Sequence, residues 1–427
     1  MKHSYLLAAA SALVLSACSE NKPPLKGTRI NFIQSAQFVP CPSLAHKKVV
    51  PGAAVANQQW PMQDQNQSQL LTPLKAPLPT AVKWQQSIGG GISSGKRFMP
   101  NMVGLNGFVY TLSPNQQVSC FDAVKGTEVW TYQPENNNTD ILSGGLSIHQ
   151  NQVITTNAAG DITALDAKNG QVLWTKNIES PVRVQPTIHQ GLVYVLTTAN
   201  EIFALDFATG NIQWQYQGMS EISALLGGAE PVVYHNHLIA AFTSGEYAAF
   251  DPKTGALQWS DMVTASLRAD TVSSMSHIIA TPVVDKDVAY VLSHGGKLLA
   301  TDLKTGNRLW QQNVAGVQQP AIVGDFLCVL SDTDELICLE KLTGKVKYAV
   351  QLKTLHEKTD QKEFYFGPQL VRDQLLVTTS SGGMLFLNPN DGALVHTFNV
   401  DAQVSRRPVI MNEVYYFITN DGDVIAY

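Results

Sequence analysis

The sequence predicts an all-β fold, an eight-bladed β-propeller made of four-stranded antiparallel blades. A segment reading Ala-Leu-Asp, a Gly-bearing turn and then Trp recurs along the 427-residue chain. Its spacing of roughly 40–50 residues is the period of propeller repeats. Each repeat contains four short runs of strand-forming residues, and nearly all predicted innermost strands begin at a proline. Together these features are typical of a propeller, in which each blade is one antiparallel sheet.

In the repeat, an Asp is followed four residues later by a Gly and eight residues later by a Trp. An Asp side chain caps a turn, and Gly adopts the positive φ that such a turn requires. We therefore expect a tight turn at each copy and a Trp that packs between blades. The clearest copies occupy 164–174, 204–214 and 249–259, and fainter copies occupy 120–130, 301–310, 339–348 and 387–396.

The eighth copy is divided between the two ends of the repeat region. The chain stops at 424–427, where an Ala-Leu-Asp strand would lie, and Trp84 follows 80–83. We therefore expect the last blade to close by pairing of N-terminal and C-terminal strands. Residues 81–427 give eight blades of about 43 residues each, the size of a four-stranded blade. Seven blades would leave Trp84 unexplained.

The third blade illustrates the four strand signals, at 186–188, 192–196, 201–206 and 211–215. Alternating or β-branched runs separated by short turns predict antiparallel strands. Proline is tolerated at the first residue of a strand, and seven innermost strands are expected to begin there. These residues are Pro100, Pro186, Pro231, Pro282, Pro320, Pro368 and Pro408, with Gly144-Gly145-Leu146 taking that place in the second blade.

The N-terminus predicts a secreted lipoprotein. Residues 1–17 combine a basic start with an apolar run, as in a secretory signal peptide. The Leu-Ser-Ala-Cys sequence at 15–18 resembles a bacterial lipobox, which implies a lipid anchor, palmitate included, on Cys18. Ser19 after the cysteine resembles the outer-membrane sorting class. The alternative is an ordinary signal peptide with a chance cysteine.

The region from Cys18 to the first predicted strand has the composition of a tether. Residues 18–80 are rich in Pro, Gln, Asn and Lys and lack sustained periodicity. A flexible tether of this length would place the propeller about 45 Å from the lipid. The formal net charge is −5, and no basic cluster falls on a predicted blade. This charge pattern argues against nucleic acid as a partner.

Four cysteines remain once Cys18 is used for lipidation. Cys120 and Cys338 fall at the Ala position of the repeat, where a small buried residue fits. Cys328 and Cys338 flank the turn at 332–334 and could face each other across one hairpin. A disulfide between them depends on a turn register that the sequence does not reveal, so both the free and the bridged states remain open.

Short motifs that suggest chemistry do not meet the requirements of that chemistry. The Gly-rich segment at 90–96 lacks the Ser or Thr after its Lys and the helix that a phosphate loop needs. His235 and His237 lack a third ligand with defined spacing, and Asp332, Asp334 and Glu335 lack a calcium-binding loop. We assign no catalytic, cofactor-binding or metal-binding residue, and we expect the protein not to be an enzyme.

The Trp-docked repeats resemble the propeller of the pyrroloquinoline quinone dehydrogenases. That resemblance is limited to the scaffold, because those enzymes use an adjacent cysteine pair beside the cofactor and this chain has no Cys-Cys. The chain also has no Cys-x-x-Cys-His for a haem. A periplasmic quinone-dependent dehydrogenase therefore remains only an alternative function.

A closer resemblance is to the BamB family of outer-membrane assembly lipoproteins. It rests on the lipobox, on the opening at 22–30, which looks like alphaproteobacterial members, and on the stretches 281–284 and 303–306. The resemblance implies a non-enzymatic scaffold anchored to the outer membrane by its lipid and facing the periplasm. Its implied partners are the POTRA region of BamA, other lipoproteins of the assembly machine and unfolded outer-membrane proteins.

Three long connections between an outer strand and the next inner strand should emerge on one face, at 132–143, 260–280 and 351–367. Loops carry recognition while a rigid scaffold positions them. In the second loop, Leu267, Arg268 and Asp270 resemble the Leu- and Arg-bearing loop with which the family grips a POTRA domain. The alternatives are a solvated loop without a partner, and a lipoprotein that binds another component of the envelope.

Overall fold

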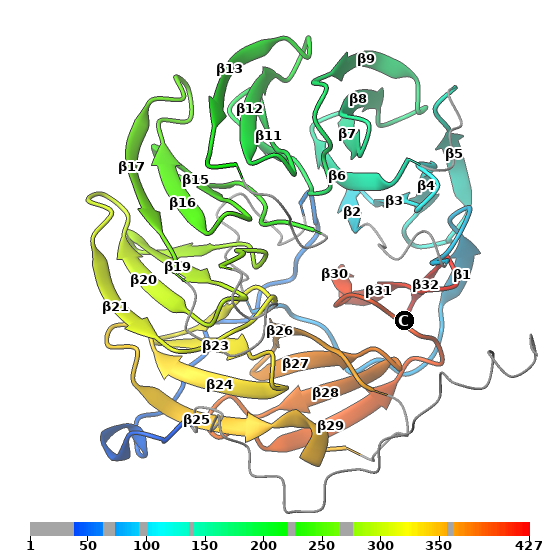
Figure 1. Ribbon diagram of the computed structural model, residues 1–427. Coiled ribbons are helices and arrows are strands. Elements are labelled where there is room, and N and C mark those ends of the chain that lie inside the picture. The colour runs from blue at the N-terminus through cyan, green and yellow to red at the C-terminus, as the bar shows by residue number, and fades with distance from the viewer. Residues whose placement is uncertain are drawn as a thin grey trace, which may run out of the picture. The chain divides into compact units, whose positions relative to one another are not determined.

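The computed structural model describes residues 38–62, 73–93, 101–135, 141–220, 227–264, 276–356 and 362–427. Eight four-stranded antiparallel sheets are arranged as blades around a common centre (Figure 1). The predicted fold class is therefore confirmed. Within these ranges, no helix is both long and apolar enough to cross a membrane.

Each of blades 1–7 consists of four strands that are consecutive in the sequence. Blade 1 contains β2 (Met102–Leu105), β3 (Phe108–Leu112), β4 (Val118–Asp122) and β5 (Glu128–Tyr132). Blade 2 contains β6 (Ser143–His149), β7 (Gln152–Asn157), β8 (Asp161–Asp166) and β9 (Val172–Asn177). Blade 3 contains β10 (Thr187–His189), β11 (Leu192–Leu196), β12 (Glu201–Asp206) and β13 (Ile212–Gln217).

The next four blades repeat this order. Blade 4 contains β14 (Val232–Tyr234), β15 (His237–Ala241), β16 (Glu246–Phe250) and β17 (Leu257–Met262). Blade 5 contains β18 (Val283–Asp285), β19 (Val288–Leu292), β20 (Leu298–Asp302) and β21 (Arg308–Gln312). Blade 6 contains β22 (Ala321–Val323), β23 (Phe326–Leu330), β24 (Glu335–Glu340) and β25 (Val346–Gln351). Blade 7 contains β26 (Tyr365–Val371), β27 (Gln374–Thr379), β28 (Gly383–Leu387) and β29 (Leu394–Asn399).

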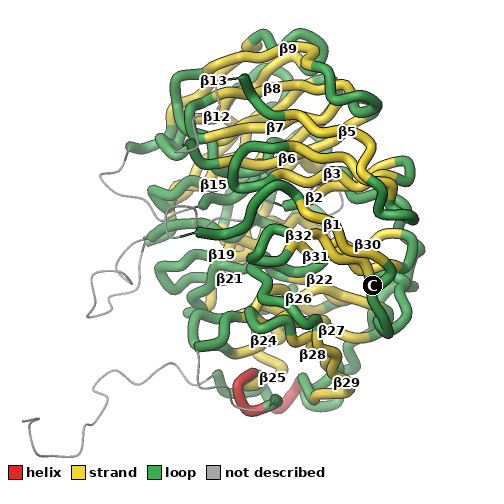
Figure 2. Tube along the Cα trace, turned by 90° about the vertical axis from the view of Figure 1, so that its right-hand side faces the viewer, coloured by secondary structure: helices red, strands yellow, loops and turns green. Residues whose placement is uncertain are grey.

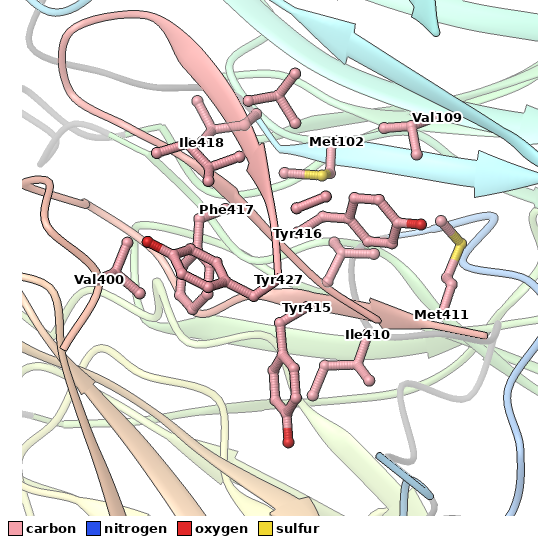
Figure 3. Packing of buried hydrophobic residues seen from close by; sticks show 14 of the residues in the cluster. Met102, Val109, Val400, Ile410, Met411, Tyr415, Tyr416, Phe417, Ile418 and Tyr427 are labelled. Carbon is pink, nitrogen blue, oxygen red and sulfur yellow. The ribbon is translucent and has the colours of Figure 1, made fainter. Parts of the chain in front are cut away.

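Blade 8 joins the two ends of the propeller. It contains β30 (Val409–Met411), β31 (Val414–Ile418), β32 (Asp423–Ala426) and, as its outermost strand, β1 (Trp84–Ser87). β1 pairs antiparallel with β32, and Trp84 lies opposite Ala426. Side chains of β30 and β31 pack with Met102 and Val109 of blade 1 (Figure 3). The predicted closure by terminal strands is confirmed.

The structure confirms the mechanical role of the Asp and the Gly in the turns of blades 1–5. In blade 3, Asp206 Oδ1 accepts hydrogen bonds from the backbone N–H groups of Ala208 at 3.1 Å and Thr209 at 2.8 Å. Gly210 has a φ of +72°, a value that costs least for glycine. The turn therefore returns the chain tightly from the third strand to the fourth.

At six of the eight junctions a tryptophan connects one blade to the next, an arrangement that we call the indole latch. The Trp Nε1–H donates to a backbone carbonyl just after the repeat Asp of the following blade, and the indole packs on that blade's turn glycine. In blade 4, Trp259 donates to Leu303 O at 2.7 Å and lies against Gly306. The six latch residues are Trp84, Trp130, Trp174, Trp214, Trp259 and Trp310.

The innermost strands mostly start where the prolines predict. In blades 3, 4, 5, 6 and 8, the inner strand starts at the residue after the proline. Blade 7 differs, because β26 begins at Tyr365 and contains Pro368 after a cis peptide bond, with a register shift beside it. Pro100 lies outside the described residues.

The structure changes the predicted boundary between tether and propeller. Residues 38–62 and 73–80, here called the strap, include the 3-10 helix η1 (Pro42–Leu44) and pack against the blades. Trp60 and Leu74 are buried, 1% and 0% exposed, and Trp60 exchanges backbone hydrogen bonds with Gly104 of β2 at 2.7 and 2.8 Å. The strap belongs to the same compact unit as the blades. A flexible tether remains a prediction only for residues N-terminal to the strap.

Candidate partner-binding face

The strands run between two faces of the propeller, with connections at both ends (Figure 2). The three connections that were predicted to be long follow β5, β17 and β25 and lead to β6, β18 and β26. The connection from β13 to β14, at 218–231, is also longer than the first of them. The chain order puts every such outer-to-inner connection on one face, which we call the loop face. The opposite face, here the strap face, carries the Asp-to-Gly turns and the strap.

The strap occupies much of its face, because its hydrogen bonds reach five blades. Cys41 N–H donates to Val346 O in blade 6, and Leu74 N–H donates to Leu370 O in blade 7. Asn57 Nδ2 donates to Ile410 O in blade 8 at 3.2 Å. Further bonds join Trp60 to Gly104 of blade 1 and Pro61 O to Ile148 N–H of blade 2. These strap contacts all lie on the strap face.

The second long connection leaves a firmly held strand. Asp261 near the end of β17 forms a two-bond ion pair with Arg308 of β21, at 2.6 Å to Nε and 2.8 Å to Nη2. Arg308 Nη2 also donates to Met262 O at 2.6 Å, and Tyr247 Oη donates to Asp261 Oδ2 at 2.6 Å. Bidentate Arg–carboxylate pairs fix geometry as well as adding energy. Blade 5 thus holds the strand from which the loop departs.

The returning end of the same connection is also held. His277 O accepts a hydrogen bond from His294 N–H at 2.9 Å, and Ile278 and Ala280 are buried. On the departing side, Val263 N–H donates to Gly245 O at 2.8 Å. Both ends of the connection are therefore fixed to the blades. Leu267, Arg268 and Asp270 themselves lie outside the described residues, as does Cys18.

The pKa of the Asp261 carboxyl reflects this anchoring. Burial acts to raise the pKa of its carboxyl, but hydrogen bonds from Arg308 and Tyr247 outweigh burial and lower it. The same hydrogen bond raises the pKa of Arg308. Sequence reasoning missed this pair, because the two residues lie in neighbouring blades and no local pattern connects them.

A second polar cluster lies where the inner strands begin on the loop face. The residue before the inner-strand proline is Gln185, Glu230, Thr281, Gln319 or Arg407 in five blades. Arg407 Nη2 donates to Gln319 Oε1 at 2.7 Å, and Glu230 N–H donates to Thr281 Oγ1 at 3.2 Å. The Gln185 amide and Glu230 Oε2 are buried without a hydrogen bond in the described part of the chain. Polar side chains therefore surround the propeller axis at this face.

The charges of this cluster follow from its position inside the ring. Burial raises the pKa of Glu230 to about 8, although Arg406 opposes the shift. Burial lowers the pKa of Arg406 and Arg407 to about 10, so both guanidinium groups remain charged at neutral pH. With Glu230 mostly protonated at neutral pH, the cluster is net positive, which favours anionic or hydrogen-bond-accepting groups.

The other motifs noted in the sequence are placed in turns and loops or at the first residue of a strand. Gly91 lies against the 420–421 backbone of blade 8, in a stretch without helix. His235 has a φ of +51° in a turn, and His237 Nδ1 contacts Gln258 Oε1. Asp332 and Asp334 lie in the hairpin turn between β23 and β24. Within the described ranges, no group of three or more His, Cys, Asp or Glu side chains could hold a metal ion.

Comparison with known families is consistent with this architecture. The family model for the outer membrane protein assembly factor BamB matches residues 114–350, more than half of the chain. The chain belongs to the BamB family. Escherichia coli (strain K12) BamB is 28% identical over 367 residues, covering 82% of this chain and 91% of that protein. An uncharacterised protein of Rickettsia prowazekii (strain Madrid E) is 28% identical over 258 residues, which cover 60% of this chain.

The match to the rickettsial protein spans 62% of that protein's length, less than two thirds of it. Among solved structures, BamB from Moraxella catarrhalis superposes with a TM-score of 0.66 at 20% identity, covering 80% of this chain and 99% of that one. A quinohemoprotein alcohol dehydrogenase from Comamonas testosteroni superposes with a TM-score of 0.67 at 11% identity, covering 87% and 81%. At these identities both superpositions show the propeller fold alone.

Proposed function

We propose that this protein is a non-enzymatic scaffold of the machinery that assembles β-barrel proteins in the outer membrane. The BamB family match over residues 114–350 carries the proposal. In it, lipidated Cys18 anchors the protein to the outer membrane, and the propeller faces the periplasm. The mechanism is binding, with a rigid ring that presents the loop face to the POTRA region of BamA.

The proposed contact lies in the connection between β17 and β18. Leu267 supplies apolar burial, and Arg268 supplies directed hydrogen bonds, a combination common in the centre of protein interfaces. Asp270 complements a basic group of the partner. The Asp261–Arg308 pair supports this role, because it holds the β17 end from which the connection departs. Fixed loop ends reduce the conformational entropy lost on binding.

The outermost strands supply a second, independent surface for unfolded barrel strands. In β9 and β13, side chains on both sides of the strand are exposed or half-buried, and each is the edge strand of its sheet in the described part of the chain. An open strand edge pairs with an extended segment through backbone hydrogen bonds. A barrel-precursor peptide that failed to crosslink to these strands would count against this part of the proposal.

The first experiment is affinity purification of the tagged, lipidated protein from gently solubilised envelopes, followed by mass spectrometry. The proposal expects a POTRA-bearing barrel protein in near-equal amount, together with other lipoproteins of the assembly machine. Recovery of only dehydrogenase or cell-wall components would contradict it and support binding of another envelope component.

The contact residues are tested in the same purification. The double substitution Leu267→Ala and Arg268→Ala is expected to remove the POTRA-bearing protein from the eluate. Leu342→Ala with Arg372→Ala is the matched control, since both are exposed residues of blades 6 and 7 at strap-face turns. Unchanged recovery with the loop variant would remove the proposed contact.

The alternative of a quinone-dependent enzyme is tested separately. A ligand that binds the native state raises the unfolding temperature and changes its own absorbance if its environment changes. Adding pyrroloquinoline quinone and calcium to the purified protein should change neither quantity. A shift in both would favour the enzymatic alternative.

A further inference from the structure

Blade 6 departs from the residue pattern that the six blades with a latch tryptophan share. Across a blade, one row of paired residues contains a Tyr or Ile in the second strand, a small residue in the third and a Trp in the fourth. In blade 3 these are Tyr194, Ala204 and Trp214. In blade 6 the same row contains Cys328, Cys338 and Tyr348. Two thiols therefore replace a bulky side chain and its small partner.

The two thiols face each other directly. Cys328 and Cys338 are paired residues of the antiparallel strands β23 and β24, and their Sγ atoms are 3.0 Å apart. Directly opposed residues of an antiparallel pair have Cα separations of about 4.5–5.5 Å, inside the range that a disulfide spans. The register that the sequence left open is thus one that permits a bridge without moving the backbone.

We propose that Cys328 and Cys338 form an intrachain disulfide in the mature protein. The inference rests on the periplasmic location proposed above, because disulfides persist in that compartment. In the reaction, the disulfide of a thiol-oxidising protein accepts two electrons from the two cysteines. One Sγ–Sγ bond forms in blade 6, one breaks in the oxidant, and the two thiol protons pass to the reduced oxidant.

The bridge forms before blade 6 packs. Both thiols are 0% exposed in the folded protein, so no protein oxidant reaches them there. Burial also raises the pKa of Cys328, which disfavours the thiolate that exchange requires. Only nine residues separate the two cysteines in the sequence, so a local hairpin is enough to bring them together. Oxidation therefore belongs to the newly exported chain.

The bridge has a structural consequence at the junction with blade 7. Tyr348 takes the place of the latch tryptophan, and its hydroxyl makes no hydrogen bond to blade 7 among the described residues. The Tyr348 ring lies in the same core cluster as both cysteines. A covalent link between β23 and β24 fixes the surface on which that ring packs.

The chain contains two internal controls. Cys120 occupies the same row position in blade 1 as Cys338 in blade 6, but it faces Tyr110 instead of a thiol. Cys41 lies in the strap and is half-buried, with its Sγ 3.2 Å from Ser43 Oγ. Both cysteines are expected to remain free thiols in the mature protein.

The test uses the full-length protein isolated from envelopes, unfolded without reductant and alkylated before proteolysis and mass spectrometry. We expect alkyl groups on Cys41 and Cys120 and a linked pair of peptides containing Cys328 and Cys338, lighter by two hydrogen atoms. Alkylation of Cys328 and Cys338 in most molecules would overturn the proposal.

A second arm of the experiment tests whether the geometry permits a disulfide independently of where the protein is located in the cell. The reduced, unfolded chain is refolded in a mixture of reduced and oxidised glutathione and then analysed in the same way. One outcome is a disulfide in the refolded protein but free thiols in the protein from envelopes. That outcome would overturn the proposed disulfide in the cell and indicate a reducing location. Free thiols in both arms would show that the paired geometry does not support a bridge. POTRA binding is measured separately by the purification, so a failure of the disulfide and a failure of the proposed function can be distinguished.

Discussion

The junctions between blades fall into two groups that the chain stabilises differently. At six junctions, from blade 8 to blade 1 through blade 5 to blade 6, an indole donates across the boundary and packs on a glycine. At the junctions from blade 6 to blade 7 and from blade 7 to blade 8, the latch position contains Tyr348 and His396 instead. The strap crosses both of these junctions on its face.

The strap contacts show how the second group is held. Lys347 Nζ donates to Lys47 O at 2.7 Å in blade 6, and Val49 N–H donates to Asn390 Oδ1 at 2.9 Å in blade 7. Leu74 then pairs with β26, and Lys75 Nζ is 3.0 Å from Glu413 Oε1 in blade 8. The repeated indole latch thus stabilises six of the junctions. The strap, which is distant from blades 6–8 in the sequence, stabilises the other two.

The largest expected effect is the loss of one latch. Trp259→Ala removes a side chain that is 9% exposed and its hydrogen bond to Leu303 O. Replacing a buried Trp by Ala costs ~3–5 kcal/mol, measured as the free energy of unfolding in urea. His396→Ala changes an exposed side chain at the same repeat position and should cost under ~1 kcal/mol. Equal losses would contradict the division of the junctions into two groups.

The free energy of unfolding should depend on pH through Glu230. This residue of blade 4 interacts with Arg406 near blade 8, so it connects a latched part of the ring with the part that the strap holds. Burial raises the pKa of Glu230 to about 8. In the unfolded chain the Glu230 carboxyl has the ordinary pKa of about 4.3 and loses its proton there. In the folded protein it keeps the proton until about pH 8. Stability should fall as pH rises through that window, by up to ~1.4 kcal/mol per pH unit.

Glu230→Gln removes this titration, so its free energy of unfolding should decline less between pH 5 and pH 8 than that of the unsubstituted protein. Urea unfolding at several pH values measures the difference. Identical slopes for the two proteins would show that Glu230 is not held protonated in the folded ring.

A smaller effect is expected at the turn glycines that contact a latch. Gly255→Ala places a Cβ at 2.5 Å from the Trp214 ring, at a φ of +71°. The left-handed backbone costs ~1–2 kcal/mol for an L-residue, and the steric clash adds to it. Gly107→Ala is the matched control, because its φ is +83° with no atom within 4 Å of the new Cβ. If both variants lose the same stability, the latch packing contributes nothing.

The smallest effect concerns a single strap contact. Asn390→Ala removes the side-chain acceptor for Val49 N–H, a loss of ~1 kcal/mol. Limited proteolysis should then cut the strap faster while the blades remain intact. Lys168→Ala, at the same turn position in blade 2, should leave the cleavage rate unchanged. Faster cleavage with both variants would indicate a general loss of stability.

The propeller was predictable because its repeat is local. Asp206, Gly210 and Trp214 lie within nine residues, and each performs one identifiable task, so eight copies reveal eight blades. The terminal closure followed from the position of Trp84 alone. The inner strand of blade 7 was mispredicted in its start, because a proline inside a strand requires the register shift that the structure places at 366–369.

The strap and the loop anchor were not predictable for a physical reason. The strap binds largely through backbone groups to residues up to about 350 positions away, as in the hydrogen bond from Asn412 N–H to Asn57 O, and backbone groups leave no sequence pattern. The Asp261–Arg308 pair likewise depends on the packing of two neighbouring blades. The proposed contact residues Leu267, Arg268 and Asp270 stay predictions.

The measurement that tests the central claim most directly is site-specific photocrosslinking of the lipidated protein in intact cells. A photoreactive residue is placed at Leu267 on the loop face or at Leu342 on the strap face, which is 83% exposed. We predict a crosslink to the POTRA region of the barrel-inserting subunit from position 267 and none from position 342. Crosslinks from position 342 alone, or from neither position, would contradict the proposed scaffold and its orientation.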